Sequence, residues 1–125
     1  MNDLTRAEEE IMQVLWNINK GFVKEILEEL PEPKPAYNTV STIVRILEKK
    51  NFVGHKSYGN SHQYYPTVLQ ENYSKHRLNK LATGYFNGSF KSMVSFFVDQ
   101  KKLSIKDLDQ ILSEIKSTED GIQPQ

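Results

Sequence analysis

The chain has 125 residues, with 16 Lys and Arg against 16 Asp and Glu, so its formal net charge is zero. This length suits one domain with at most a dependent appendage. The absence of cysteine excludes disulfides, cysteine nucleophiles and thiolate metal sites. No apolar run approaches the roughly 18 residues that cross a membrane, and no signal-peptide core is recognisable, so we expect a cytoplasmic protein.

A first helix is predicted from the start of the chain. The run Thr5-Arg6-Ala7-Glu8 fits a capping box, in which a threonine hydroxyl and a glutamate carboxylate satisfy free amides of the first helical turn. The helix should continue to about residues 19–21, because its apolar residues recur at helical spacing. These apolar residues are Ile11, Val14, Leu15 and Ile18.

A second, shorter helix is predicted over about residues 22–30. Prolines at positions 31, 33 and 35 end it, because proline lacks an amide donor and restricts the residue before it. The apolar residues on its inner side are Val23, Ile26, Leu27 and Leu30.

The most informative segment is AYNTVSTIVRILEKK, residues 36–50, which reads as a helix with two contrasting faces. The apolar face holds Val40, Ile43, Val44 and Leu47. The opposite face, called the polar stripe below, holds Asn38, Ser41, Thr42, Arg45 and Lys49. Short hydrogen-bonding groups followed by cations suit base edges and phosphates in a DNA groove. Taken alone, the same pattern also fits an ordinary amphipathic helix with a solvated face.

The order of these elements favours DNA binding. A helix, a short helix, a proline-rich turn and an amphipathic helix form the order of a helix-turn-helix unit. A hairpin is predicted directly afterwards, over residues 52–58 and 61–65, because Gly59-Asn60 is a two-residue turn signal. Such a basic and aromatic hairpin is typical of a wing, so the sequence predicts a winged helix. One of Tyr64 and Tyr65 is expected to pack this hairpin on the core.

The charge distribution agrees with this interpretation. Residues 1–32 carry three Lys or Arg against eight Asp or Glu, a net charge of −5. Residues 33–66 carry five against one, a net charge of +4. Binding to a polyanion needs a local basic face and not a basic chain. The same segmentation can also arise by chance.

Residues 67–125 predict three more helices, separated by breaks at residues 84–88 and 100–103. The last helix starts with a cap-like Ser104-Ile105-Lys106-Asp107. About 60 residues of helical arm supply little material for an independent core, yet the arm is rich in aromatic residues. We therefore expect a second copy of the chain to cover it. The alternative is that the helices fold back on the winged helix in one compact monomer.

No catalytic or metal site is expected. The histidines are His55, His62 and His76. The first two could share a face of the hairpin, but a metal site generally needs three or four protein ligands. Exposed or hydrogen-bonded histidines are the simpler interpretation. No Gly-rich phosphate loop and no nucleophile elbow are present, so we expect neither an enzyme nor a cofactor.

Several motifs resemble the penicillinase-repressor family of the BlaI/MecI type. The opening segment LTRAEEEIMQVLW, residues 4–16, is similar to the family's first signature. So are the segment NTVST at residues 38–42, the segment LEKK at residues 47–50 and the wing end Tyr64-Tyr65-Pro66. The resemblance covers roughly residues 3–116. It implies dimeric winged-helix repressors that bind palindromic operators, often beside a membrane-bound metalloprotease sensor.

The resemblance also implies how repression ends. Such repressors are inactivated when a sensor-triggered cut falls in the stretch that corresponds to Met93–Asp99. The resistance repressors typically present an Asn-Phe bond there, whereas this chain has Phe96-Phe97. Because of that departure, only the logic of tail damage carries over to this chain, and the cleavage chemistry, the protease and the resistance role do not.

These patterns combine into one hypothesis. The fold is mainly α with a small β-hairpin: a winged helix-turn-helix over residues 1–66, a helical dimerisation region over 67–118 and a flexible tail over 119–125. The expected function is sequence-specific repression by a homodimer that binds operator DNA, and the resemblance adds a membrane-bound sensor metalloprotease as a partner. The alternative is a protein-interaction module, although the polar stripe lacks the apolar anchors that such a surface needs.

Two sets of residues carry this hypothesis. The expected DNA-binding residues are Asn38, Thr39, Ser41, Thr42, Arg45, Lys49, Lys50, Lys56, Tyr58 and Asn60. Of these, Thr39 and Lys50 lean toward the flank of the helix. The expected dimer-interface residues are Phe90, Val94, Phe97, Leu108, Ile111, Leu112 and Ile115.

Overall fold

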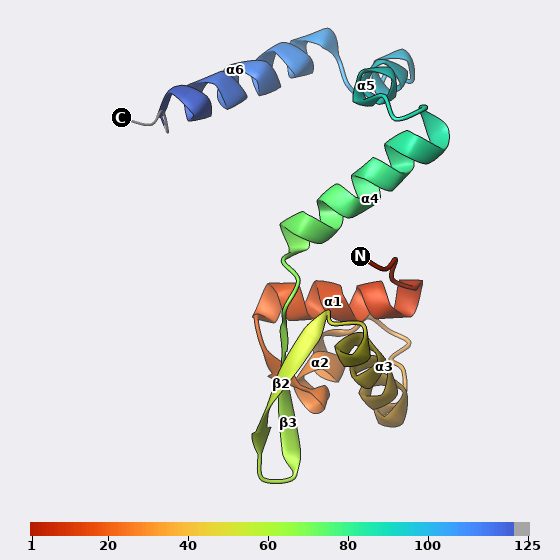
Figure 1. Ribbon diagram of the computed structural model, residues 1–125, viewed down its shortest axis with the longest axis vertical. Helices are drawn as coiled ribbons and strands as arrows, with labels where there is room; N and C mark the ends of the chain where they lie inside the picture. The colour runs from red at the N-terminus through yellow and green to blue at the C-terminus, as the bar shows by residue number, and fades with distance from the viewer. Residues whose placement is uncertain (122–125) are drawn as a thin grey trace. The chain divides into compact units, whose positions relative to one another are not determined.

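The computed structural model describes residues 1–121, with side chains described as far as Ile115. Figure 1 shows the elements in chain order. They are α1 (Arg6–Ile18), β1 (Gly21–Phe22), α2 (Val23–Glu29), α3 (Tyr37–Lys49), β2 (Val53–Tyr58), β3 (Ser61–Pro66), α4 (Gln70–Tyr85), α5 (Phe90–Asp99) and α6 (Ile105–Gly121). The chain divides into two compact units, Met1–Arg77 and a second that begins at Leu78.

The first unit is a winged helix, which confirms the predicted fold class. Helices α1, α2 and α3 pack together, and the β2–β3 hairpin projects from them (Figure 1). The turn of this hairpin is Gly59-Asn60, and Gly59 adopts a φ of +61°, which favours glycine. The sequence signals for the three helices and for the hairpin were therefore sufficient.

A third strand was not expected from the sequence. The sheet has the order β1-β3-β2, and all its pairings are antiparallel. Gly21 of β1 pairs with Tyr64, and Phe22 pairs with Gln63. A two-residue strand has no alternating pattern to detect, so only its partner reveals it. A Cβ atom at Gly21 would lie 2.9 Å from the end of the Ile18 side chain, which would have to shift to make room.

The core of the first unit lies where the three helices meet the base of the hairpin. Its largest fully buried side chains include Phe52, Ile11, Met12, Leu15, Ile26 and Leu47. The apolar face predicted for α3 is confirmed: Val40, Val44 and Leu47 are fully buried, and Ile43 packs at the edge. Tyr64 is the tyrosine that packs the hairpin on the core, since it is 4% exposed while Tyr65 is 41% exposed.

Local capping signals decide where two helices begin. The Thr5 hydroxyl accepts a hydrogen bond from the Glu8 amide at 3.2 Å, and the Glu8 carboxylate accepts one from the Thr5 amide at 2.8 Å. Ser104 and Asp107 make the same reciprocal pair at the start of α6, at 3.0 and 3.1 Å. Both capping boxes were predicted and both are confirmed.

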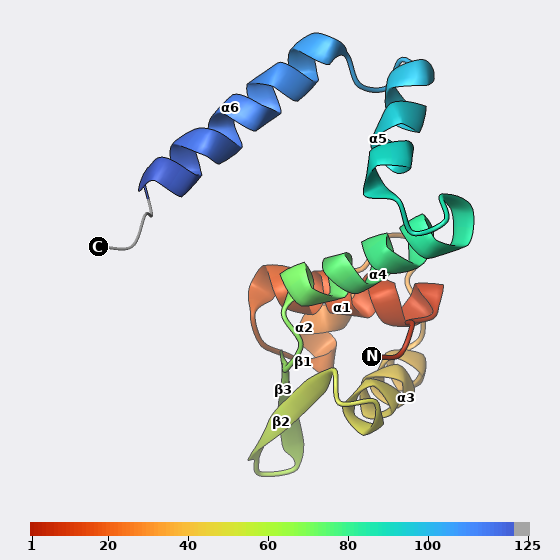
Figure 2. The same ribbon diagram turned by 45° about the horizontal axis from the view of Figure 1, so that its top comes forward.

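The boundary expected between residues 66 and 67 coincides with the end of β3, whereas the compact first unit continues to Arg77. The reason is Tyr73 of α4, which is buried in the core of the winged helix. Figure 2 shows the first turns of α4 lying along α1. The breaks predicted in the helical arm are confirmed, because α4 ends at Tyr85, α5 begins at Phe90 and α6 begins at Ile105.

Helix α6 extends to Gly121, past residue 119, where the sequence analysis started the tail. The capping box at Ser104 starts this helix, and no proline or glycine interrupts it before position 121. Residues 122–125 of the expected tail lie outside the described residues.

Candidate nucleic-acid interface

Helix α3 presents its polar stripe to solvent because its opposite face is locked into the core. Packing of Val40, Val44 and Leu47 against α1, α2 and β2 fixes the rotation of the helix about its axis. Four members of the stripe are exposed and Ser41 is half-buried. Thr39 is exposed beside them. A helix with a buried apolar side and a free row of donors and acceptors can enter a DNA major groove.

Arg45 is the centre of this surface. Its Nε donates a hydrogen bond to the Ser41 carbonyl at 3.2 Å, and its Nη2 lies 3.5 Å from the Ser41 hydroxyl. The guanidinium therefore rests on its own helix with exposed donors to spare. A guanidinium in this position can present two parallel donors to the O6 and N7 atoms of guanine.

An open groove of about 690 Å³ separates α3 from the wing. Ser41 and Arg45 line it from α3, and Asn60 and His62 line it from the wing. Tyr37 also lines this groove, although the sequence analysis did not select it. The signal was present, because Tyr37 lies four residues before Ser41 and therefore on the same side of the helix.

On the wing, the ammonium of Lys56 lies over the aromatic ring of Tyr58. The Lys56 ammonium lies 5.3 Å from the centre of the Tyr58 ring. That ring meets Phe22 edge-on, with centroids 5.8 Å apart. Tyr58 thus joins the wing to β1 and at the same time positions Lys56. Asn60 lies exposed in the turn, at the tip of the wing.

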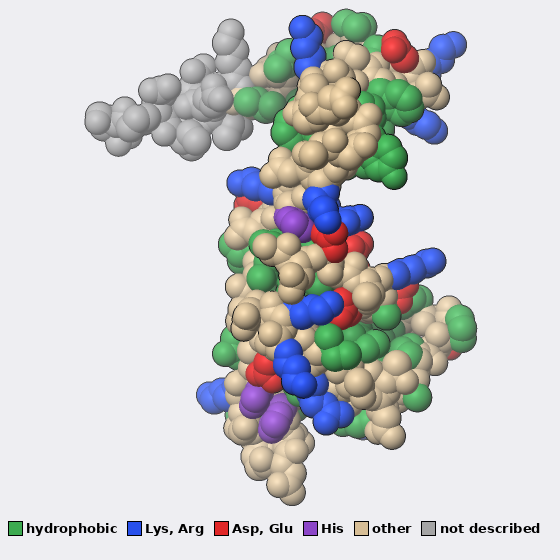
Figure 3. Space-filling view, turned by 45° about the vertical axis from the view of Figure 1, so that its right-hand side comes forward, with side chains coloured by type: hydrophobic (Ala, Val, Ile, Leu, Met, Phe, Trp, Pro, Cys, Tyr) green, Lys and Arg blue, Asp and Glu red, His purple; other side chains and the backbone are tan. Residues whose placement is uncertain are grey.

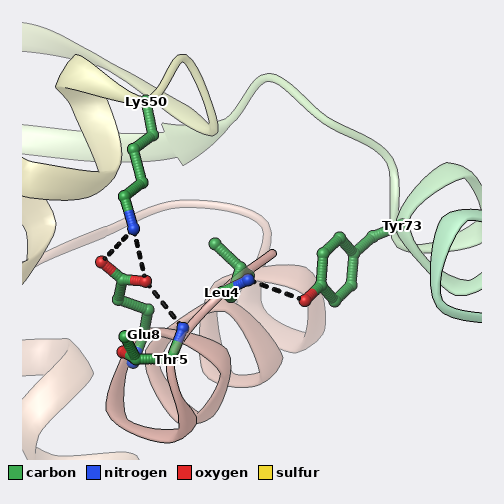
Figure 4. A network of polar contacts seen from close by, with 5 residues as sticks. All are labelled: Leu4, Thr5, Glu8, Lys50 and Tyr73. Carbon is green, nitrogen blue, oxygen red and sulfur yellow. Dashed lines mark hydrogen bonds and ion pairs between the residues drawn. The ribbon is translucent and has the colours of Figure 1, made fainter. Parts of the chain in front are cut away.

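Lys50, which was expected among the DNA-binding residues, pairs its ammonium with an acidic residue of α1. Its Nζ lies 2.9 Å from both carboxylate oxygens of Glu8 (Figure 4). Glu8 is buried, with 4% of its surface exposed. Burial would raise the pKa of Glu8, but hydrogen bonds from Lys50 and from the Thr5 amide outweigh burial and hold that pKa below its ordinary value. The Lys50 charge is thereby paired with the Glu8 carboxylate within the first unit.

Two histidines of the wing stack against each other beside α3. The His55 and His62 rings are nearly parallel, at 7°, with centroids 4.1 Å apart. His55 Nδ1 lies 2.5 Å from a carboxylate oxygen of Glu48. His76 pairs instead with Asp3, at 2.7 Å. Among the described residues, no group of three or more His, Cys, Asp or Glu side chains could hold a metal ion.

Tyr64 lies next to this histidine pair and is largely shielded from water. Burial raises the pKa of the Tyr64 phenol, and the nearby Glu48 carboxylate raises it further, against a smaller opposing effect of Arg45. Figure 3 shows Lys and Arg side chains gathered beside histidines at the end of the first unit that carries the wing. Residues 33–66, which include α3 and the wing, carry a net charge of +4 although the whole chain is neutral.

The expected dimer-interface residues lie on α5 and α6 of the second unit. Phe90, Phe97, Ile111, Leu112 and Ile115 are exposed in the single chain, and Val94 and Leu108 are half-buried. Leu112 reaches 62% exposure, which is high for a leucine. The buried apolar side chains among the described part of this unit are Ala82 and Met93.

Fold and surface together define a DNA-binding protein of the winged-helix class. The chain belongs to the penicillinase repressor family, whose model matches residues 4–117. The penicillinase repressor of Bacillus licheniformis is 29% identical over 91% of this chain and 92% of its own length. The methicillin resistance regulatory protein MecI of Staphylococcus aureus (strain N315) is 28% identical over 87% of this chain and 89% of its own length.

One solved structure, described as a CopR repressor structure, covers 54% of this chain and 99% of its own, with 28% identity and a TM-score of 0.45. Family membership makes the chain a transcriptional repressor and not an enzyme. None of the described helices is both long and apolar enough to cross a membrane.

Proposed function

We propose that the chain represses transcription in the cytoplasm by binding a palindromic operator as a homodimer. The observation that carries this proposal is the exposed polar stripe of α3, backed by a fully buried apolar face. Ser41, Thr42 and Arg45 would read base edges, with Asn38 at the helix entry. Thr39 would contact a phosphate at the flank.

The phosphate contacts would come from Lys49, Lys56 and Asn60. Lys49 lies exposed at the end of α3, and the other two lie exposed on the wing. Lys50 is left out of this set, because Glu8 holds its ammonium. Tyr58 supports Lys56 through their ring contact, so we assign Tyr58 a positioning role.

The dimer is supported by the second unit. Several of its aromatic and aliphatic side chains, among them Phe90, Leu112 and Ile115, are exposed in the single chain. Contiguous exposed apolar side chains commonly mark an interaction surface. A second copy would cover them and would place two recognition helices on two half-sites with matching symmetry. The residues expected to meet the second copy are Phe90, Val94, Phe97, Leu108, Ile111, Leu112 and Ile115.

Release of repression would follow damage to α5. A cut by a membrane-bound sensor protease in Met93–Asp99 would interrupt α5, which carries several of the proposed interface residues. The DNA-binding helix would stay intact, but operator occupancy would fall because the two half-sites lose their coupling.

A gel-shift series tests the proposal. The probe is the DNA upstream of the chain's own gene, at two salt concentrations, with an unrelated duplex of equal length as the control. We expect a specific complex whose affinity falls with salt, and sedimentation of a dimer at micromolar concentration. Equal affinity for both duplexes, or a monomer in sedimentation, would contradict it.

A further inference from the structure

The first two turns of α4 are fastened to the winged helix through one face. Gln70, Tyr73 and His76 lie three residues apart and therefore share a side of the helix. The Gln70 amide donates to Gln13 at 3.2 Å. The Tyr73 hydroxyl accepts a hydrogen bond from the Leu4 amide at 3.0 Å (Figure 4).

The residues before α1 complete this attachment. Asp3 lies 2.7 Å from His76 Nε2 and 3.7 Å from Arg77 Nη1. We call the set Asp3, Leu4, Tyr73 and His76 the N-terminal clasp. It closes over α4 at its second turn, just before the first unit ends at Arg77.

An aromatic contact lies beneath the clasp. Tyr73 is buried, and its ring meets Phe52 edge-on at 5.7 Å and Trp16 at 5.9 Å. The Trp16 indole in turn donates a hydrogen bond to the Val68 carbonyl at 2.8 Å. Burial of Tyr73 fastens the start of α4, whereas the polar clasp fixes its direction, because ring packing alone permits a helix to pivot.

The clasp is also connected to the end of α3. Leu4 bonds to Tyr73, and the adjacent Thr5 bonds to Glu8, which holds Lys50 at the end of α3. Figure 4 shows this chain of contacts, in which a short segment before α1 lies between the two helices. These contacts therefore connect the start of α4 to the end of α3 within the first unit.

We propose that the N-terminal clasp determines which spacing between operator half-sites the repressor accepts. This inference rests on the proposed dimeric function. Helix α4, whose first two turns the clasp holds, continues without a break to Tyr85. One additional base pair moves a half-site by about 3.4 Å and rotates it by about 35°. A stiff attachment cannot follow that displacement, whereas a loosened one can.

Two conservative substitutions loosen the clasp without removing apolar packing. Tyr73→Phe keeps the buried ring but takes the acceptor from the Leu4 amide. Asp3→Asn removes the charge that faces His76 and Arg77. Lys75→Ala is the matched control, because Lys75 lies on the same helix in an exposed ion pair with Glu71.

The experiment compares the wild type, the double variant D3N/Y73F, D3N alone and K75A. The half-site is first selected with wild-type protein from a duplex library with a random segment. Affinity is then measured for one half-site and for palindromes spaced up to two base pairs either side of the optimum. We expect the wild type and K75A to lose about tenfold for one base pair, and the double variant about threefold or less.

The affinity for one half-site should be the same in all four proteins. This control distinguishes a change in spacing preference from a loss of folded protein. D3N alone, which leaves every core residue in place, should broaden the profile in the same direction. An unchanged spacing profile in both clasp variants would overturn the clasp proposal alone. A wild type that binds its best palindrome no more tightly than one half-site would overturn the clasp and the dimeric function together.

Discussion

The Lys50 Nζ lies 2.9 Å from each carboxylate oxygen of Glu8, and this ion pair joins the end of α3 to the first turn of α1 across 42 residues of sequence. Glu8 is buried, and its two partners, Thr5 and Lys50, neutralise and orient it. The Glu8 side chain is 6% exposed and the Lys50 side chain 28% exposed, so removal of Lys50 would leave a buried carboxylate without its cation, which is destabilising. The role of this pair is therefore to fix the position of α3, more than to raise stability.

Glu8→Gln should lower the free energy of unfolding by about 1–3 kcal/mol near neutral pH, because Lys50 then lacks its carboxylate partner. Glutamine can still complete the capping box, so the start of α1 should persist. Urea titrations followed by circular dichroism would measure the difference.

The same ion pair predicts a pH dependence. The pKa of Glu8 is lowered in the folded protein from its ordinary value of 4.5. The stabilisation is thus complete above pH 4.5 and is lost as pH falls through the folded pKa. The gap between the wild type and Glu8→Gln should therefore narrow in acid. A gap that stayed constant down to the acid transition would show that the Glu8 charge does not contribute.

Arg45→Ala should weaken specific operator binding by about 1–3 kcal/mol, the usual value of a good bidentate base contact. The melting temperature should stay unchanged, since the guanidinium is exposed and bonds only to Ser41. Fluorescence anisotropy with operator and unrelated duplexes would measure the loss. Wild-type affinity in this variant would remove Arg45 from the reading surface.

Lys56→Ala should weaken binding to all duplexes alike and flatten the slope of log affinity against log salt by about one unit. Lys50→Gln is the matched control and should leave that slope unchanged, because its ammonium faces Glu8 and not DNA. If the two variants flattened the slope equally, Lys50 would contact a DNA phosphate despite its ion pair with Glu8 in the free protein.

The features that could be predicted from sequence are those whose signals are local. Examples are the capping box at Thr5, the turn at Gly59-Asn60 and the apolar face of α3. Each of these signals is formed by residues that are close together in the sequence. The pairs that were missed join distant positions. The capping box predicted the bond between Glu8 and Thr5, but nothing near Glu8 in the sequence indicates its pairing with Lys50.

The same reason explains the end of the winged helix. Tyr73 lies in the stretch that the sequence analysis assigned to the helical arm, but it is buried against Trp16 and Phe52 of the first unit. Periodicity reveals that a face is apolar and not which surface covers it. In the candidate site, helical spacing was enough to predict which residues form the polar stripe. The contact between Tyr58 and Phe22 could not be predicted, because it depends on how the strands of the sheet pair.

A chain ending after Arg77 should therefore fold as a monomer, whereas one ending after Thr67 should be less stable by about 3–5 kcal/mol, the cost of removing a large buried aromatic side chain. The shorter chain lacks both Tyr73 and the Val68 carbonyl that accepts from Trp16. The melting temperatures of the two shortened chains would measure this difference in stability. Equal melting temperatures would mean that α4 contributes nothing to the winged helix.

A single break in the backbone between Met93 and Asp99 should abolish tight operator binding and leave binding to one half-site intact. Met93 is buried within α5, so the helix must open locally before a protease can reach the bond. A protease site inserted in this stretch allows the cut to be made in purified protein. Nicked protein that still sedimented as a dimer at full operator affinity would rule out this mode of release.

Strand β1 has a consequence for how the wing moves. Its two residues pair with Tyr64 and Gln63, so the base of the hairpin shares hydrogen bonds with the segment that opens α2. Beyond that pairing, from His62 to the turn, β3 pairs with β2 alone. We therefore expect slow amide hydrogen exchange at the base, which opens only with the core, and fast exchange at the tip. The tip can then adjust to the path of a DNA backbone while the base keeps the wing in register with α3.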